Sequence, residues 1–124
     1  MSLTEITGKA ASCIRACQEA ALASERCAHA CLHESGIDAL RRCIALDLDN
    51  AEVCRTTVYL LAHGSALTAE MCGVCIKSCE ATAAEGEKHA HHGHCQENAR
   101  ACRRAVEELT RYVRLRDGEA RAAA

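Results

Sequence analysis

The sequence predicts an all-α fold, and specifically an antiparallel up-down-up-down four-helix bundle. Proline is absent from all 124 residues, so nothing interrupts the long runs of helix-forming side chains. No window alternates apolar and polar residues in the manner of a half-buried strand. Glycines fall at intervals that suit short turns, and short loops between long helices make neighbouring helices antiparallel.

The glycine-containing turns divide the chain into four segments of helical composition, which we expect at residues 3–33, 37–63, 67–85 and 89–116. Ser35-Gly36 precedes the second segment, and Asp38 completes a pattern that resembles a capping box. Gly64-Ser65 separates the second and third segments. We expect one domain over residues 1–116 and a frayed C-terminal tail over residues 117–124.

The composition excludes several classes of protein. A formal net charge of -2 and an aromatic content of 2% argue against a nucleic-acid binder, which needs basic and stacking side chains. No stretch approaches the ~20 apolar residues of a membrane helix, so no membrane partner is expected. The first residues lack the basic start and apolar run of a signal peptide, which predicts a cytoplasmic protein.

Cysteine is the most unusual feature of the composition, with 11 residues in the chain. A cytoplasmic protein keeps its thiols reduced, and an odd count leaves at least one thiol without a partner in any disulfide scheme. The sequence is also rich in alanine and long, whereas disulfide scaffolds are short and rich in loops. We therefore expect free thiols.

Helical periodicity places the cysteines of each expected helix on one face. Taking about 100° per residue, the four cysteines of the first segment lie within about 40° of one line, and those of each other segment cluster similarly. A bundle would turn these faces inward, toward a common axis. The candidate metal ligands are Cys13, Cys17, Cys27, Cys31, Cys43, Cys54, Cys72, Cys75, Cys79, Cys95 and Cys102.

A stripe of cysteine and alanine is also compatible with an ordinary tight core, because free cysteine behaves as a small hydrophobe. However, a core built only for stability would place leucine at these positions. Three pairs have the spacing C-x-x-x-C, which puts two sulfurs on adjacent turns of one helix face. These pairs favour the soft ion Cu(I), which accepts two or three sulfur ligands; Zn(II) and iron–sulfur clusters normally take four and prefer C-x-x-C loops.

Histidines concentrate before the fourth segment. His91 precedes Cys95 by four residues and is predicted to lie on the same side of the helix, as a further metal ligand. His89, His92 and His94 would stand where an ion enters the bundle, although a solvated loop explains them equally well. His29 and His33 point away from the cysteine face and are expected at the surface or at a subunit contact.

The sequence also resembles a known family, the cysteine-rich four-helix-bundle copper storage proteins, over about residues 10–110. The resemblance rests on RCIALDLD at 42–49, AEVC at 51–54, EMCGVC at 70–75 with Cys79, HCQE at 94–97 and ACRR at 101–104. It implies a cytosolic bundle, commonly a homotetramer, that holds several Cu(I) ions along its axis through thiolates.

The chain departs from that family at positions where further cysteines are usual. These positions hold Asn50, Thr82, Gly86, Asn98, Ala105 and Leu109. Asp47 also falls toward the inner face, where a buried carboxylate needs a partner such as Asn98 or an arginine. We therefore expect fewer Cu(I) ions per chain than in a full family member.

The sequence thus predicts a Cu(I) storage protein that is not an enzyme, since it lacks a phosphate-binding loop and any clear pairing of nucleophile and base. Two alternatives stay open. One is an iron–sulfur or redox protein using Cys72, Cys75, Cys79 and one thiol from another helix. The other is a helical oligomeric scaffold that has lost most of its metal storage.

Overall fold

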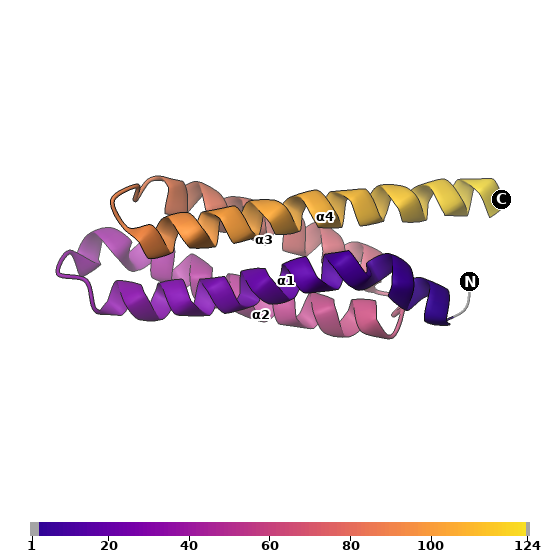
Figure 1. Ribbon diagram of the computed structural model, residues 1–124, viewed down its shortest axis with the longest axis horizontal. Coiled ribbons are helices and arrows are strands. Elements are labelled where there is room, and N and C mark those ends of the chain that lie inside the picture. The colour runs from indigo at the N-terminus through magenta and orange to yellow at the C-terminus, as the bar shows by residue number, and fades with distance from the viewer. Residues whose placement is uncertain (1–2, 124) are drawn as a thin grey trace.

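The structure is a computed structural model that describes the backbone of residues 3–123 and the side chains of residues 8–122, and it confirms the all-α bundle (Figure 1). Successive long helices run in opposite directions, and each packs against its neighbours in the order α1–α2–α3–α4, with α4 returning to α1. Their bounds are α1 Leu3–Leu32, α2 Arg41–Ala62, α3 Thr68–Glu87 and α4 Gly93–Ala123, and a short 3₁₀ helix, η1 Ile37–Leu40, leads into α2.

The start of the second helix differs from the predicted one. Residues 37–40 form the 3₁₀ turn η1, and Gly36 precedes it without any side-chain capping hydrogen bond. Asp38 does not complete a capping box, because its Oδ1 accepts a hydrogen bond from Arg41 Nε at 2.8 Å instead. The α-helical geometry therefore begins only at Arg41.

The last helix is longer than expected. Residues 117–123 continue α4, where the sequence predicted a frayed tail, and residue 124 lies outside the described part. Arginine, glutamate and alanine in this segment favour helix, and Gly118 alone costs only about 1 kcal/mol against that preference. An ion pair between Lys9 and Glu119 also ties the end of α4 to α1.

The core is made mostly of small side chains, and cysteine and alanine dominate it. Small side chains let helices approach closely, and the contact between α3 and α4 depends on this at Gly86. A Cβ atom added to Gly86 would lie 2.8 Å from the backbone oxygen of Cys95. Glycine at position 86 therefore permits close packing of α3 and α4.

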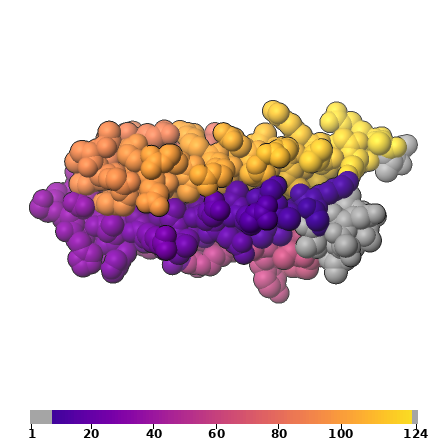
Figure 2. Space-filling model, in the orientation of Figure 1, coloured from indigo at the N-terminus to yellow at the C-terminus, as the bar shows by residue number. Residues whose placement is uncertain are grey.

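Charged residues cover the outside and join neighbouring helices. Arg103 on α4 pairs with Glu87 on α3 at 2.8 Å, and Arg104 on α4 pairs with Glu19 on α1 at 2.6 Å. Figure 2 shows α1 and α4 in contact along much of the bundle. Two arginines of the α4 surface thus hold adjacent helices together. Within residues 3–123, no helix combines the length and apolarity needed to cross a membrane.

Two glycine substitutions in α3 test the close approach of α3 and α4. Gly86→Ala is expected to lower the free energy of unfolding by about 1–3 kcal/mol, because the added methyl group overpacks the contact with Cys95. Gly73→Ala is the matched control, since nothing lies within 4 Å of its added Cβ. It should raise stability by up to about 1 kcal/mol through helix propensity. Urea unfolding of the reduced proteins measures both, and equal effects would contradict the predicted steric clash.

Candidate metal centre

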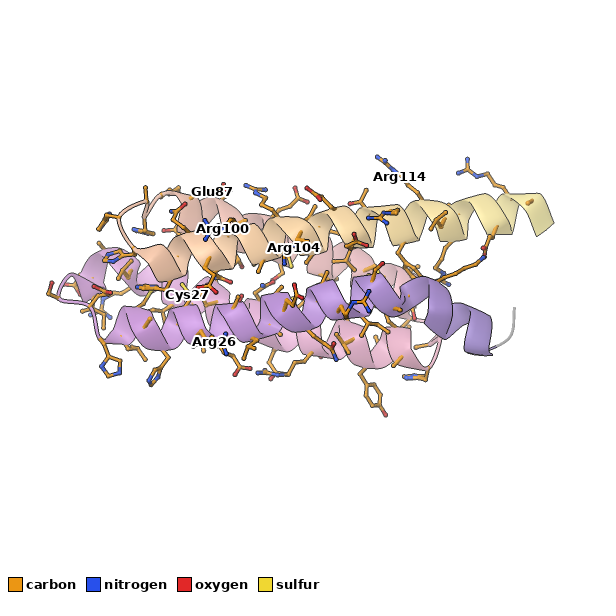
Figure 3. All side chains as sticks on the ribbon, in the orientation of Figure 1. Arg26, Cys27, Glu87, Arg100, Arg104 and Arg114 are labelled. Carbon is orange, nitrogen blue, oxygen red and sulfur yellow. The ribbon has the colours of Figure 1, made fainter. Side chains whose placement is uncertain are left out.

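All eleven cysteines are free thiols and are 0–1% exposed, so the structure brings every predicted cysteine ligand into the interior of the bundle. The helical periodicity explains this placement, because each cysteine face turns toward the axis. In Figure 3 the labelled Cys27 lies on the side of α1 that faces α4, whereas its neighbour Arg26 points away from the bundle. The sulfurs form two groups along the axis.

The first group, called here the outer thiol group, lies near the turns that join α1 to η1 and α3 to α4. It contains Cys27 and Cys31 of α1, Cys43 of α2 and Cys95 of α4, whose sulfurs all lie within 4.8 Å of one another. Cys27 Sγ is 3.9 Å from Cys31 Sγ and 3.8 Å from Cys95 Sγ. Four sulfurs from three helices thus meet at one point.

His94 caps the outer thiol group. Its Nδ1 atom lies 3.6 Å from Cys27 Sγ, 3.8 Å from Cys31 Sγ and 3.6 Å from Cys95 Sγ. Its Nε2 atom lies 3.1 Å from Glu34 Oε1. A carboxylate only accepts hydrogen bonds, so Nε2 donates its hydrogen to Glu34 and the other ring nitrogen, Nδ1, faces the sulfurs. His94 is therefore placed to add a nitrogen ligand to the group.

The other histidines of this turn have different surroundings. His91 is exposed, contrary to its predicted place beside Cys95, because α4 begins at Gly93 and helical spacing does not extend back to residue 91. His89 Nε2 lies 3.0 Å from a carboxylate oxygen of Glu85. His92 Nδ1 lies 3.6 Å from Glu34 Oε2. Glu34, His92 and His94 together form a partly buried cluster. His29 and His33 are exposed, as expected.

The second group, called here the inner thiol group, centres on Cys54, Cys75 and Cys79, whose sulfurs lie within 4.8 Å of one another. Cys54 Sγ is 3.7 Å from each of the other two. The structure thus groups Cys54, rather than Cys72, with the last two cysteines of α3. Four more cysteines belong to the same buried cluster, and we count them in the inner thiol group, which thus has seven members. They are Cys13, Cys17, Cys72 and Cys102.

Four buried polar residues lie between the two groups, and we call them the polar layer: Ser24, Asp47, Asn50 and Asn98, all 0–1% exposed. The sequence placed Asp47, Asn50 and Asn98 on the inner face, and Asn98 does partner Asp47, with Nδ2 donating to Oδ1 at 2.8 Å. Ser24 was missed, although it falls about 20° from the cysteine line of the first helix. Glu34 was also missed, because it lies in a turn where no periodicity applies.

Hydrogen bonds between thiols, together with burial, shift the pKa values of the cysteines. In the outer group a hydrogen bond from Cys27 lowers the pKa of Cys43 to about 6, while burial raises the pKa of Cys31 to about 11. In the inner group, hydrogen bonds from neighbouring thiols, Cys17 first, hold the pKa of Cys75 well below its usual range. The hydrogen bond to Cys13 raises the pKa of Cys17. Each group therefore has one sulfur that accepts hydrogen bonds from its neighbours.

Asp47 lies directly beside the outer thiol group, with Oδ2 3.8 Å from Cys43 Sγ. Burial raises the pKa of Asp47 to about 8, and the adjacent Cys43 sulfur adds to the rise. Its hydrogen bond from Asn98 satisfies one oxygen without bringing a compensating positive charge. A second negative charge at this point is therefore disfavoured unless a cation enters the group.

Clustered sulfurs in a water-poor interior suit soft metal ions, and metal binding would replace the thiol protons. The outer thiol group has four sulfurs and the nearby imidazole nitrogen of His94, whereas the inner group has one compact set of three sulfurs, from Cys54, Cys75 and Cys79. Fold and site together define the class: a four-helix bundle whose interior is lined with thiols able to bind soft metals.

Comparison with known proteins identifies the family within that class. The pattern of the Csp (copper storage protein) family matches residues 6–114, so the chain belongs to this family, and the predicted resemblance is confirmed. A Bacillus subtilis relative described as the uncharacterized cysteine-rich protein YhjQ is 38% identical over 90 residues, which cover 73% of this chain and 82% of the relative.

Two solved structures are similar over most of the chain. The Cu(I)-bound copper storage protein BsCsp3 is 34% identical, with a TM-score of 0.81 over 85% of this chain and 98% of the other. A cytosolic copper storage protein from Streptomyces lividans, solved with five coppers, is 31% identical, with a TM-score of 0.84 over 89% of this chain and 96% of the other.

The contact between Glu34 and His94 generates a prediction about metal affinity. Glu34→Ala is expected to weaken binding of the metal ion next to His94 by about 10–100-fold, because the ring loses the acceptor that orients it. Glu34→Gln keeps an acceptor oxygen and should recover most of the affinity. Competition with a Cu(I) chelator measures the affinity, and ¹⁵N NMR of the imidazole checks that Nε2 carries the hydrogen.

The matched control is Glu97→Ala, which removes an exposed carboxylate from α4. It should leave the affinity unchanged. A His94 ring protonated on Nδ1, or equal affinities for Glu34→Ala and the control, would contradict the orienting role of Glu34.

Proposed function

We propose that this protein stores Cu(I) in the cytoplasm, with the ions held by thiolates inside the bundle. The observation that carries the proposal is the burial of eleven free thiols in two clusters of a chain that belongs to the copper storage family. Copper prefers sulfur to the oxygen ligands of the surface, and imidazole also binds it. All eleven cysteines and His94 are the proposed ligands, and His92 with His89 flank the mouth through which an ion would enter.

Storage fits the chemistry of these sites better than catalysis does. The sulfurs are fully buried, and the polar groups beside them include other thiols, the Asn50 amide, the Asp47 carboxylate and the His94 ring. Burial in a sulfur-rich interior favours retention of a metal ion over turnover of a substrate. We therefore propose no enzymatic activity.

The proposed capacity is several Cu(I) ions per chain, but fewer than in a family member with all its cysteines. Thr82, Ala105 and Leu109 are buried at positions where the family usually has thiols, and each fills its space without offering sulfur. Leu61, Leu109 and Tyr112 belong to the same buried cluster as the inner thiols and form ordinary apolar packing there. Part of the bundle thus serves as core rather than store.

Zn(II) is a second candidate for the outer thiol group alone. Four sulfurs within 4.8 Å of one another match the number of ligands that a tetrahedral zinc site takes. Among the residues that the structure describes, the inner thiol group has no set of four sulfurs this close together. Its compact set has three, from Cys54, Cys75 and Cys79. Measuring copper, zinc and iron together therefore separates copper storage from a zinc or an iron–sulfur site.

Metal analysis tests the proposed function. Protein purified reduced and without oxygen is expected to bind more than one Cu(I) per chain and to melt at a higher temperature when loaded, since ligands that bind only the folded state stabilise it. Removing the copper with an excess of chelator should restore the lower melting temperature. Binding of less than one equivalent in competition with a chelator would contradict storage, as would a preference for zinc or iron.

We also propose that the protein is a homo-oligomer, with a tetramer as the expected state. A groove of about 830 Å³ between α1 and α2 is lined by Leu22, Leu32 and Leu48, which are 49–57% exposed. Its lining also includes Arg26 and Glu52. Two copies related by a twofold axis can therefore cover apolar surface while pairing opposite charges.

Light scattering tests this assembly. The wild-type protein should have about four times the 13.3 kDa mass of one chain. Leu48→Glu should shift it to smaller species, because a carboxylate would be buried in the contact. Leu115→Glu, at a leucine of α4 with similar exposure, is the matched control and should keep the wild-type mass. The reverse pattern would place the contact on another face.

A further inference from the structure

The polar layer reaches across the bundle between the two thiol groups. Ser24 comes from α1, Asp47 and Asn50 from α2, and Asn98 from α4, while Ser78 of α3 joins from the fourth side. All four helices therefore contribute to one cross-section of the axis. Metal-binding thiols precede and follow this cross-section on α1 and α2, so it interrupts a column that would otherwise be continuous.

Hydrogen bonds link the members of the polar layer into one network. Ser24 Oγ donates to Asn98 Oδ1 at 3.0 Å and accepts from Asn50 Nδ2 at 3.0 Å. Asn98 donates in turn to Asp47 at 2.8 Å, and Ser78 Oγ donates to Asn50 Oδ1 at 2.8 Å. Leaving any of these buried groups without a hydrogen-bond partner costs free energy, so breaking the network to let an ion bind there is unfavourable.

The network has thiols on both of its faces. On one face, Asn50 Oδ1 accepts a hydrogen bond from Cys79 Sγ at 3.4 Å, and Asn50 Nδ2 donates one to Cys102 Sγ at 3.3 Å. On the other face, Asp47 lies beside Cys43. The buried apolar residues divide at the same place, with the seven inner cysteines in one packed cluster and the four outer cysteines in another. The polar layer is thus a boundary in packing as well as in chemistry.

Amide and hydroxyl oxygens are poor ligands for a soft monovalent ion, which prefers sulfur. An ion on one side of the polar layer consequently shares no sulfur ligand with an ion on the other side. We propose that the polar layer divides the interior into two Cu(I) compartments that fill independently: four thiols with His94 outside it, and seven thiols inside it. This inference rests on the proposed storage function and adds that the store has two parts.

A cycle of serine variants tests independence. One variant carries Cys27→Ser, Cys31→Ser and Cys95→Ser in the outer group, a second carries Cys54→Ser, Cys75→Ser and Cys79→Ser in the inner group, and a third combines all six. Native mass spectrometry counts the Cu(I) ions that each reduced protein retains after a chelator wash. Independent compartments predict that the loss in the combined variant equals the sum of the two separate losses. A difference of more than one ion would overturn the proposal.

A measurement on the wild-type protein guards against variants that fail to fold. The protein is half-loaded with Cu(I) and quenched in denaturant with an alkylating agent, so that thiols not bound to copper are labelled. Independent filling predicts that, within single chains, protection of one thiol group does not depend on protection of the other, so chains with only one group protected occur. Protection of Cys43 and Cys102, on the two sides of the layer, that always occurs together in the same chains would overturn the proposal.

A variant that replaces the two asparagines of the polar layer by cysteine tests whether the layer is what separates the compartments. Asn50→Cys with Asn98→Cys returns sulfur to two family positions and should join the compartments, so the same cycle in this background becomes non-additive. Continued additivity there would overturn the role assigned to the polar layer. Failure of the storage function gives a different result, since a wild-type protein that binds less than one Cu(I) contradicts storage whatever the cycle shows.

Discussion

The burial of eleven thiols along one axis is the constraint on which the rest of this structure depends. Thiols are weak hydrogen-bonding groups, so they can be buried in numbers that hydroxyls or amides could not match without many unpaired donors. Because thiols are small, the helices lie close together. Only small side chains then fit between them, and alanine fills the remaining core while α3 meets α4 at Gly86. Stability and metal affinity consequently depend on the same side chains.

The polar layer shows how such a bundle can lose thiols without losing its fold. The resemblance described above places Asn50 and Asn98 at positions where cysteine is expected in this family, and replacing sulfur by an amide requires partners for both the oxygen and the nitrogen. Ser24, Ser78 and Asp47 supply them from other helices: Ser24 and Ser78 partner Asn50, and Ser24 and Asp47 partner Asn98. Asn98 in turn satisfies the carboxylate whose pKa burial raises to about 8. These residues form one unit, and a change in any of them leaves another without a partner.

At the outer end, two turns that are far apart in the sequence meet and combine their side chains. Glu34 follows α1 and His94 opens α4, and the contact between them turns one ring nitrogen toward the thiols. The position of this mouth follows from the antiparallel order of the helices, which brings the first and third connections to the same end (Figure 1). The chemistry of the mouth thus depends on the topology of the bundle.

The sequence by itself determined the bundle and the inward direction of the cysteines. Both follow from a local rule, the turn of about 100° per residue that puts Cys13, Cys17, Cys27 and Cys31 on one line. Tertiary structure decided which sulfurs meet across helices, as Cys54 meets Cys75 and Cys79. It also decided the positions of the histidines, because a helix that begins at Gly93 leaves His91 exposed and places His94 at the thiols. The axial offset between helices and the path of a turn arise from packing between distant segments, and no periodicity within one segment encodes them.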